Sequence, residues 1–301
     1  MKATKAIVTG ATGYVGSRLA ARLASEGWDV HAVARPDSNP RLLEKLTGNL
    51  TIHRYDGTID RLFAIFQEAK PEIVFHLASV FMAEHRPGDI EPMLRANVLF
   101  GTQLAEAMAR YGVSRLINTG TSWQHYENSD FNPVCLYAAT KQAMDSILTY
   151  YVEAASIKVI TLKLFDTYGP GDPRKKLFSL LQEAASGRGA LEMSGGEQLI
   201  DLVYIDDVVQ AYRLAAARLL GGLTKGGETY ALSSGKPIPL KKLVELVAQS
   251  MGRKLPIEWG ARPYRKREVM IPWSKGEPLP GWQPTITLEE GLLKMGFGSK
   301  P

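Results

Sequence analysis

The sequence predicts an α/β fold in which a doubly wound parallel sheet is joined to a smaller C-terminal α/β domain. Two observations predict it. In the first half of the chain, apolar strand-like runs alternate with helix-like segments through six strands, which is the pattern of a parallel sheet covered by helices. After Phe165 the elements become short, and Gly and Pro gather in residues 167–174. We therefore expect residues 1–166 and 201–222 to form the first domain, and residues 167–200 and 223–301 to form the second.

The expected strands of the first half are short apolar runs, as buried parallel strands are. They lie at residues 6–9, 30–34, 50–54, 73–77, 116–119 and 159–165. The expected helices lie between them, at residues 15–25, 62–69, 93–111 and 137–155. In the second of these helices the apolar side chains share one helical face: they are Leu62, Phe63, Ile65, Phe66 and Ala69.

The second half continues with shorter elements. We expect a helix over 177–188, a strand over 200–204, and a helix over 208–219 whose N-cap is Asp206 or Asp207. Beyond a glycine-rich linker at 221–227, a strand (229–232), a helix (240–251) and a further strand (257–259) follow. The last helix begins at Thr287, with Glu290 three residues later as a capping box.

The charge of the chain points to a small anionic partner. The 301 residues carry a formal net charge of +5, and part of this excess lies in a basic segment at residues 253–267. The segment has no nucleic-acid-binding motif. Attraction of a small anionic substrate explains it more simply, although some of its residues form a solvated basic face in any case. We expect no nucleic-acid partner.

The sequence also limits the location of the protein. No apolar run reaches the roughly 20 residues of a membrane span, and the apolar run at 6–8 is too short for a signal peptide. The one cysteine, Cys135, leaves no intrachain disulfide. No cluster of His, Asp and Glu has metal-ligand spacing. We expect a cytoplasmic protein with no membrane partner and no metal.

A glycine-rich turn follows the first strand and precedes the first helix. Gly10, Gly13 and Gly16 are each separated by two residues. In this context the first glycine permits a tight turn, the second lets a pyrophosphate approach the backbone, and the third lets the helix pack on the strand. The positive end of the helix then faces the anion. Residues 9–16 therefore predict a dinucleotide site.

The end of the second strand selects the dinucleotide. A carboxylate there would bind the adenosine ribose of NAD, but the sequence has Arg35, whose guanidinium suits the 2′-phosphate of NADP. Asp37, two residues further, could still reach a ribose. We expect NADP, with NAD as the alternative. Asp56, at the end of the third strand, is either a partner of the adenine amino group or a turn residue before Gly57.

Tyr137 and Lys141 lie four residues apart, on one face of the helix that follows the fifth strand. A nearby ammonium stabilises a phenolate and lowers the pKa of a tyrosine. The tyrosine can give its proton to the alkoxide formed when a ketone is reduced, and Lys141 can also hold the nicotinamide ribose. A hydroxyl from the end of the fifth strand, within residues 119–122, could stabilise charge on the carbonyl oxygen.

Further motifs accompany the glycine turn and the Tyr137/Lys141 pair. They are residues 76–79 (HLAS), 97–98 (NV) with 101–102 (GT), 164–171 (LFDTYGPG), 204–208 (YIDDV) and 281–284 (GWQP). With these motifs, the chain resembles the extended short-chain dehydrogenases/reductases of the sugar-nucleotide epimerase/dehydratase family over nearly its whole length. The resemblance implies a Rossmann-like sheet, a nucleotide-diphosphate sugar as substrate, and a homodimer formed through the helices at 93–111 and 137–155.

The resemblance also implies roles for individual residues. The catalytic hydroxyl falls on Ser122, four residues before Tyr126, with Thr121 as the alternative. The cofactor would contact Gly10, Thr12, Gly13, Tyr14, Val15, Gly16, Arg35, Asp56, Leu77, Ala78, Thr119, Tyr137, Lys141 and Leu164. The substrate would contact Ser79, His85, Ser122, Trp123, Asp166 and Arg265.

Some of these roles have a plainer alternative. His85 and His125 either reach the substrate or lie in surface loops, and Trp123 either packs on the sugar or covers the core. His76, on a buried strand, is expected to be structural. Cys135 has no neighbouring feature that would activate it as a nucleophile.

The sequence departs from the family at two positions. Asp166 stands where the family commonly has an Asn that contacts substrate near the pyrophosphate, and a carboxylate is a poor neighbour for that anion. Ile200 stands where the family often has an Arg. Arg265 with Glu268 resembles a late Arg-x-x-acid element whose Arg binds the diphosphate, and Arg267 is the alternative.

The residues after Ser122 bear on the reaction. Family 4,6-dehydratases need an acid pair there, but the chain has Trp123 and Gln124, which cannot transfer those protons. Family 4-epimerases hold NAD tightly and usually carry Asp at the end of the second strand, where this chain has Arg35. Residues 118–125 resemble those of CDP-paratose synthase-like 4-ketosugar reductases.

We therefore expect an NADPH-dependent reductase of a nucleotide-linked 4-keto-deoxyhexose, with hydride delivered to C4 and a proton delivered by Tyr137. A sugar-nucleotide 4-epimerase with tightly bound NAD is the first alternative. A non-catalytic NADP-binding sensor or scaffold is the second, and the presence of both Tyr137 and Lys141 argues against it.

Overall fold

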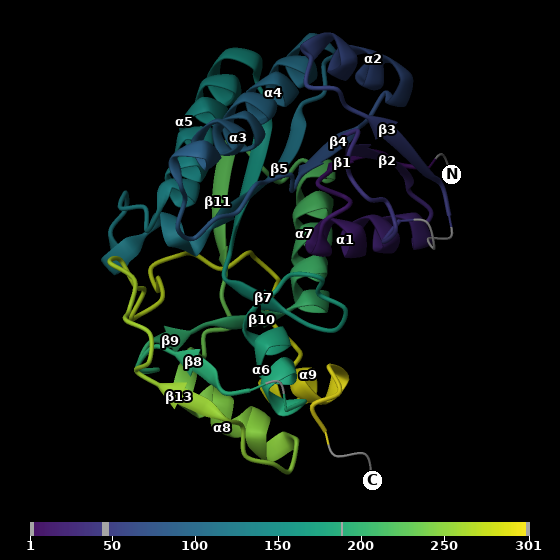
Figure 1. Cartoon of the computed structure of the whole chain (residues 1–301). Helices are drawn as coiled ribbons and strands as arrows, with labels where there is room; N and C mark the ends of the chain where they lie inside the picture. The colour runs from purple at the N-terminus through teal and green to yellow at the C-terminus, as the bar shows by residue number, and fades with distance from the viewer. Residues whose placement is uncertain (1–2, 44–47, 188, 299–301) are drawn as a thin grey trace.

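A computed structural model of the chain describes residues 3–43, 48–187 and 189–298 (Figure 1). Within these residues, parallel strands form a seven-stranded sheet in the order β11-β6-β5-β4-β1-β2-β3. The strands are β1 (Lys5–Thr9), β2 (Asp29–Ala34), β3 (Leu50–Arg54), β4 (Ile73–His76), β5 (Arg115–Thr121), β6 (Lys158–Leu164) and β11 (Gly227–Leu232). The predicted doubly wound parallel sheet is confirmed.

Helices cover both faces of the sheet (Figure 1). Each face has its own apolar core. One face packs against α1 (Tyr14–Ser25) and α7 (Ile205–Leu220), with Leu19 and Tyr212 fully buried. The other packs against α2 (Ile59–Ala69), α4 (Phe100–Arg110) and α5 (Leu136–Ala155). Both faces are therefore covered, which is why the strands are continuous apolar runs.

The helix predicted over residues 93–111 begins earlier and is interrupted. A short 3₁₀ turn, η1 (Pro87–Asp89), leads into α3 (Ile90–Leu94), and a π-helical turn, η2 (Arg95–Leu99), joins α3 to α4. π-helical turns are rare and are found mostly at functional sites. This one holds Asn97, which is 1% exposed, beside the loop that follows β4.

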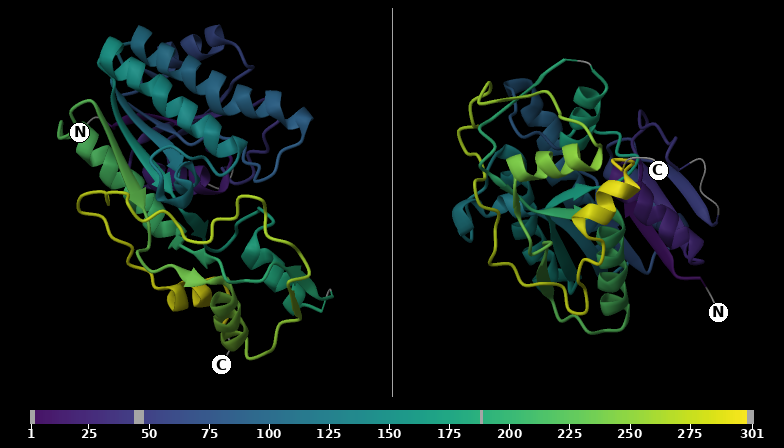
Figure 2. Two further views of the ribbon diagram at one scale, coloured as in Figure 1. Left: turned by 90° about the vertical axis from the view of Figure 1, so that its left-hand side faces the viewer. Right: turned by 90° about the horizontal axis from the view of Figure 1, so that it is seen from below.

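A smaller part of the chain lies below the sheet in Figure 1. It consists of β7 (Asp166–Tyr168), α6 (Leu177–Ala185), β8 (Leu191–Met193), β9 (Leu199–Ile200), β10 (Leu202–Tyr204), β12 (Ile238–Pro239), α8 (Leu240–Ser250), β13 (Ile257–Trp259) and α9 (Leu288–Lys294). Its strands pair two by two: β10 with β7, β12 with β9, and β13 with β8. The irregular segment between β13 and α9, residues 260–287, passes the lower end of the sheet (Figure 2), where Pro278 pairs with Ala231 of β11.

The structure differs from the predicted domain division at β11. This strand comes from the segment 223–301 that was assigned to the second domain, yet it pairs in parallel with β6 along its whole length. It thereby covers the edge of β6, which would otherwise carry unpaired backbone groups.

The strand predicted over residues 200–204 is divided in two. β9 pairs with β12, whereas β10 pairs with β7. Asp201 separates them because its buried carboxylate accepts hydrogen bonds from the Ser233 hydroxyl at 2.5 Å and the Ser234 backbone N–H at 2.8 Å.

The predicted N-cap of the following helix is wrong. α7 begins at Ile205 after Tyr204, so Asp206 and Asp207 both lie in its first turn. The Asp207 carboxylate instead accepts hydrogen bonds from the backbone N–H groups of Thr285 and Ile286, at 3.0 and 3.1 Å.

The predicted capping box of the last helix is confirmed, with the Thr287 and Glu290 side chains each accepting a backbone hydrogen bond from the other residue. α6 ends at Ala185, three residues before the predicted end at Arg188, which lies outside the described residues. Among the described helices, none combines the length and apolarity needed to cross a membrane.

Candidate active site

The glycine turn between β1 and α1 leaves room only for backbone. A Cβ at Gly10, whose φ is +69°, would lie 2.6 Å from the backbone nitrogen of Ala78, and a Cβ at Gly16 would lie 2.2 Å from the carbonyl oxygen of Gly10. α1 begins directly after Gly13, and no side chain caps its N-terminus. The N–H groups of the first helical turn are therefore left to face an anion.

The turn forms one end of a cavity of about 260 Å³, which we call the cofactor cavity. It runs past the carboxyl ends of β1, β4, β5 and β6. The predicted cofactor residues that line it are Gly10, Gly13, Tyr14, Val15, Gly16, Leu77, Thr119, Tyr137, Lys141 and Leu164. This set fits a dinucleotide, because it offers a helix N-terminus for a diphosphate at one end and a tyrosine and a lysine at the other.

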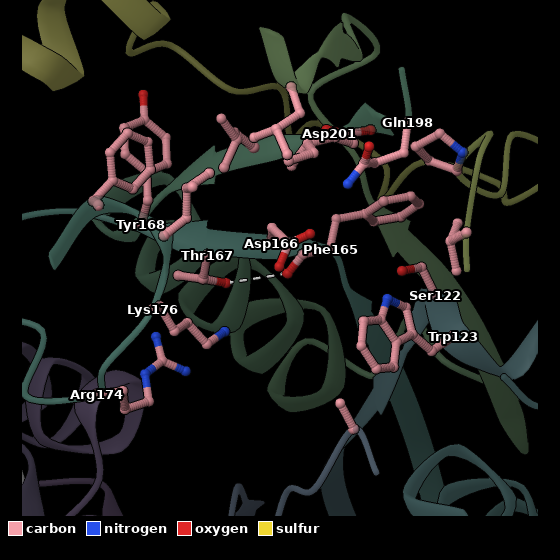
Figure 3. A pocket seen from close by; sticks show the side chains of 18 of the residues that line it. Ser122, Trp123, Phe165, Asp166, Thr167, Tyr168, Arg174, Lys176, Gln198 and Asp201 are labelled. Carbon is pink, nitrogen blue, oxygen red and sulfur yellow. Dashed lines mark hydrogen bonds between the residues drawn. The ribbon is translucent and has the colours of Figure 1, made fainter. Parts of the chain in front are cut away.

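A second cavity of about 450 Å³ adjoins the first and reaches into the smaller part of the chain; we call it the substrate cavity (Figure 3). The residues that line both cavities are Phe81, Ser122, Trp123, Phe165, Asp166, Thr167, Arg174 and Lys176. This shared wall is where molecules bound in the two cavities would meet.

Tyr137 and Lys141 lie one turn apart on α5, and both line the cofactor cavity. Burial raises the pKa of Tyr137 to about 12, although a hydrogen bond with Ser79 opposes the rise. Burial lowers the pKa of Lys141 to about 8, and the Asp145 carboxylate opposes that fall. The lowering of the Tyr137 pKa that we expected from Lys141 is not found: desolvation dominates, so that the phenol is protonated at neutral pH.

Ser122 opens a 3₁₀ turn, η3 (Ser122–Gln124), lines both cavities, and directs its hydroxyl toward the substrate cavity (Figure 3). Thr121, its alternative, lines only the cofactor cavity. The Thr121 hydroxyl is already used as the N-cap of the turn, where it accepts the Trp123 backbone N–H at 3.3 Å. This geometry favours Ser122 for contact with a substrate.

Trp123 carries its ring on the shared wall rather than in the core. The ring centroid lies 5.6 Å from that of Phe81, and the Arg265 guanidinium lies 5.1 Å above the Trp123 ring. Arg265 lines the substrate cavity and donates two hydrogen bonds to Glu268, at 2.9 and 2.6 Å. Arg267 instead stacks over Tyr126 at 4.3 Å and lines neither cavity.

Asp166 and Lys176 face each other across the shared wall (Figure 3). Desolvation raises the pKa of the Asp166 carboxyl and lowers the pKa of the Lys176 ammonium, while the charge of each group opposes the shift of the other. The carboxylate that is unexpected beside an anion therefore has a cation opposite it. No motif marks Lys176 in the sequence.

Two arginines, Arg35 and Arg54, lie close together in the backbone where β2 and β3 end. Arg35 directly follows β2, is exposed, and has its Nε 3.4 Å from the Asp37 carboxylate. Arg54, which the sequence does not single out, donates from Nη1 to the carbonyl oxygens of Arg35 and Ser38, at 2.9 and 3.0 Å. Arg54 thereby holds the loop that carries Arg35.

The remaining predicted contact residues divide into two groups. Ser79 lines the cofactor cavity rather than the substrate cavity. Thr12, Asp56, Ala78 and His85, like Arg35, line neither cavity. Asp56 accepts the backbone N–H and hydroxyl of Thr58 at 2.9 and 2.7 Å, which favours its interpretation as a turn residue. His85 is exposed in the loop after β4.

Two further polar side chains are brought to the site: Asn97 belongs to a motif to which the sequence assigns no role, and no sequence signal marks Gln198. Asn97, from the π-helical turn, accepts the Ser79 hydroxyl at 3.1 Å and donates to the Thr140 hydroxyl at 3.0 Å, so it ties the loop after β4 to α5. Gln198 lines the substrate cavity and is 8% exposed. Among the described atoms, its Oε1 has no hydrogen-bond partner.

Two histidines near the site, His76 and His125, form hydrogen bonds with other protein groups. His76 is within hydrogen-bond distance of the Thr9 hydroxyl, at 2.9 Å, and burial lowers its pKa to about 3, so it is neutral and structural. His125 lines the substrate cavity, and both of its ring nitrogens have partners, in Lys163 and in the Ser129 carbonyl. Within the described part of the chain, no group of three or more His, Cys, Asp or Glu could hold a metal ion.

Comparisons with known proteins agree with this geometry. A model of the NAD dependent epimerase/dehydratase family matches residues 6–230. The chain is 27% identical to a CDP-abequose synthase of Salmonella muenchen, over 97% of this chain and 96% of that protein. It is 28% identical to a UDP-glucose 4-epimerase of Mycolicibacterium smegmatis, over 96% of each.

Solved structures match at similar coverage. MoeE5 in complex with UDP-glucose and NAD superposes with a TM-score of 0.82 at 27% identity, over 97% of both chains. The UDP-glucose 4-epimerase of Thermus thermophilus, in complex with NAD, gives a TM-score of 0.81 at 22% identity over 97% of both chains, a likeness of fold alone. The chain is therefore an enzyme that belongs to the NAD dependent epimerase/dehydratase family of extended short-chain dehydrogenases/reductases.

Proposed function

We propose that this enzyme is an NADPH-dependent reductase of a nucleotide-linked 4-keto-deoxyhexose. The observation that carries the proposal is the wall shared by the two cavities. Ser122 lines both cavities, while Tyr137 and Lys141 line the cofactor side. A carbonyl group held in the substrate cavity would therefore lie beside the hydroxyl, the phenol and the cofactor together.

Each of the three side chains has a role in this reaction. NADPH, when bound, supplies the hydride that adds to C4 of the sugar. The Ser122 hydroxyl donates a hydrogen bond to the carbonyl oxygen and stabilises the charge that develops there. Tyr137, protonated at neutral pH because its pKa is about 12, gives its proton to that oxygen. Lys141 holds the nicotinamide ribose and stabilises the phenolate that remains.

The residues after Ser122 support reduction over dehydration. Gln124 is fully buried, and its amide binds Asp145 at 2.7 Å and the Thr121 backbone N–H at 3.0 Å. It supports the turn and does not face the substrate. Trp123 has no titratable group. The proton transfers of a dehydration therefore have no donor at these positions.

The charges around the substrate cavity support a nucleotide-diphosphate sugar. Arg174, Lys176 and Arg265 line it, and guanidinium and ammonium groups suit a diphosphate. The similarity to CDP-abequose synthases supports a deoxysugar. Arg35 supports NADP, because no acid stands at the end of β2. We further propose that the enzyme acts in the cytoplasm.

A 4-epimerase with tightly bound NAD is the second candidate. Similarity to UDP-glucose 4-epimerases favours it, and the same hydroxyl, tyrosine and lysine would serve the oxidation and reduction of one substrate. It differs in outcome, because an epimerase consumes no net cofactor. Arg35 at the end of β2 argues against the epimerase, because its guanidinium suits the 2′-phosphate of NADP, which NAD lacks.

Replacing Tyr137 by Phe tests the proposed acid. Tyr137→Phe should lower the rate of ketone reduction by roughly 100-fold or more, the usual contribution of a general acid, with NADPH binding unchanged. The measurement is NADPH oxidation with a nucleotide-linked 4-keto-6-deoxyhexose, beside NADPH binding by fluorescence. Tyr150→Phe, at an exposed position of the same helix, is the control and should keep full activity. Retained turnover in Tyr137→Phe would contradict the assignment.

A further inference from the structure

A second buried lysine, besides Lys141, lies next to the turn of residues 121–125 that carries Ser122. Lys163 stands on β6 and is 5% exposed. Its ammonium donates a hydrogen bond to Nε2 of His125 at 2.6 Å, and it lies 3.7 Å from the Asp145 carboxylate. It also lies 5.6 Å over the Trp273 ring. A buried ammonium needs such partners, since desolvating an unpaired charge is costly.

Asp145 is the carboxylate that joins this lysine to the active site. Its Oδ2 accepts the Gln124 amide at 2.7 Å, and its Oδ1 accepts the Asn118 amide at 3.3 Å. On α5 it lies four residues after Lys141, hence on the same helical face. The Asp145 carboxylate therefore interacts electrostatically with two ammonium groups, that of Lys141 on its own helix and that of Lys163 on β6.

The same contacts fix the turn that carries Ser122. Gln124 accepts the Thr121 backbone N–H at 3.0 Å while it donates to Asp145. His125 accepts from Lys163, and its Nδ1 donates to the Ser129 carbonyl oxygen at 3.1 Å. Asp145 thus holds Gln124 directly and Thr121 through Gln124, and Lys163 holds His125.

We propose that Asp145, paired with Lys163, is a positioning residue of the active site: it holds the turn of residues 121–125 and keeps the Lys141 ammonium charged. The inference rests on the proposed function, because it concerns the catalytic roles of Ser122 and Lys141. It goes beyond that function because neither Asp145 nor Lys163 lines a cavity.

The charged state of Lys141 depends on a small set of neighbours. His76 on β4 is neutral, and Tyr137 on α5 is protonated at neutral pH. Asp145 opposes the loss of the Lys141 proton, whereas burial promotes it and leaves the pKa of Lys141 at about 8. Lys163, on β6, attracts the same carboxylate. Removing the carboxylate should make Lys141 lose its proton at a lower pH, and removing Lys163 should do the reverse.

The test is the pH dependence of kcat/KM for ketone reduction, together with the pH dependence of NADPH binding by fluorescence. In the unmodified enzyme both should fall as pH rises through about 8, the pKa of Lys141. In Asp145→Asn the midpoint of this fall should move down by roughly one pH unit, the lower end of the effect of one opposite charge. Asp145→Glu should restore it, and Lys163→Gln should move it upward.

The matched control is another carboxylate that lines neither cavity. Asp207→Asn removes a carboxylate that binds Thr285 and Ile286; it should lower the thermal midpoint and leave the pH midpoint unchanged. A pH midpoint that stays in place in both Asp145→Asn and Lys163→Gln would overturn the inference. An unmodified enzyme that reduces no nucleotide-linked ketosugar would instead overturn the proposed function, and the binding profile would still decide the inference.

Discussion

Tyr137 and Lys141 are both protonated at neutral pH, and burial affects them in opposite ways. Burial raises the pKa of the phenol to about 12 and lowers that of the ammonium to about 8. A protonated tyrosine suits the delivery of a proton to an alkoxide, which is the direction of ketone reduction. Since the Lys141 pKa is the lower of the two, Lys141 loses its charge first as pH rises. We therefore expect the rate of ketone reduction to fall as pH rises through about 8.

Arg35 is the residue on which we base the proposal of NADP. Arg35→Asp should lower the ratio of kcat/KM for NADPH to that for NADH by roughly tenfold or more, because a hydrogen bond between charged groups is worth about 1.5–3 kcal/mol. Parallel steady-state kinetics with the two cofactors provide the measurement. Arg22→Asp, on the exposed side of α1, is the control. A ratio that does not change would mean that Arg35 does not contact the 2′-phosphate.

The turn from β1 to α1 is the element that local sequence rules describe best. Its three glycines predict a close approach of backbone, and a Cβ at Gly10 or Gly16 would indeed overlap backbone atoms. The overlap at Gly16 is internal to the turn, 2.2 Å from the Gly10 carbonyl oxygen. The turn therefore needs glycine for its own geometry as well as for a ligand.

Gly16→Ala should destabilise the protein by about 1–3 kcal/mol, the usual cost of overpacking, and should weaken NADPH binding. Thermal unfolding and fluorescence titration measure the two effects. Gly88→Ala is the control, because a Cβ at Gly88 would meet nothing within 4 Å. If Gly16→Ala bound NADPH with unchanged affinity, the turn would not be the cofactor site.

Other elements could be predicted only in part, because their partners are remote in sequence. The periodicity of apolar residues located the strands of the main sheet within a few residues. It could not divide residues 200–204, since the division depends on Asp201 binding Ser233 and Ser234. It could not identify the role of Asp207 either, whose partners begin at Thr285. Helix-capping rules consider only neighbours along the chain.

At the scale of the whole molecule, the candidate active site lies where the two cavities meet. Besides Phe81, the shared wall combines three segments: Ser122 and Trp123 after β5, Phe165 to Thr167 after β6, and Arg174 with Lys176 before α6. Motifs predicted the first two segments. The third has no motif, because its position depends on how the smaller part folds against the sheet.

Helices α3 to α5 expose apolar side chains that support a homodimer. Leu94 and Leu99 are each 43% exposed, and Tyr150 is 65% exposed. We propose that these helices form the interface, and Tyr150→Glu should then shift the protein from dimer to monomer in size-exclusion chromatography with light scattering. Phe131→Glu, at a residue 76% exposed outside these helices, is the control. A monomeric unmodified protein, or a Tyr150→Glu variant that stays dimeric, would contradict this interface.

The most direct test of the central claim is the stoichiometry of cofactor use. The purified enzyme is incubated with NADPH and, in separate reactions, with CDP-, UDP- and dTDP-linked 4-keto-6-deoxy or 4-keto-3,6-dideoxy sugars, while NADPH absorbance and sugar product are both measured. The reductase proposal predicts one NADPH oxidised for each 4-hydroxy sugar formed. A sugar product formed without net NADPH oxidation would contradict it and favour the epimerase, and NADPH binding without any product would favour a non-catalytic protein.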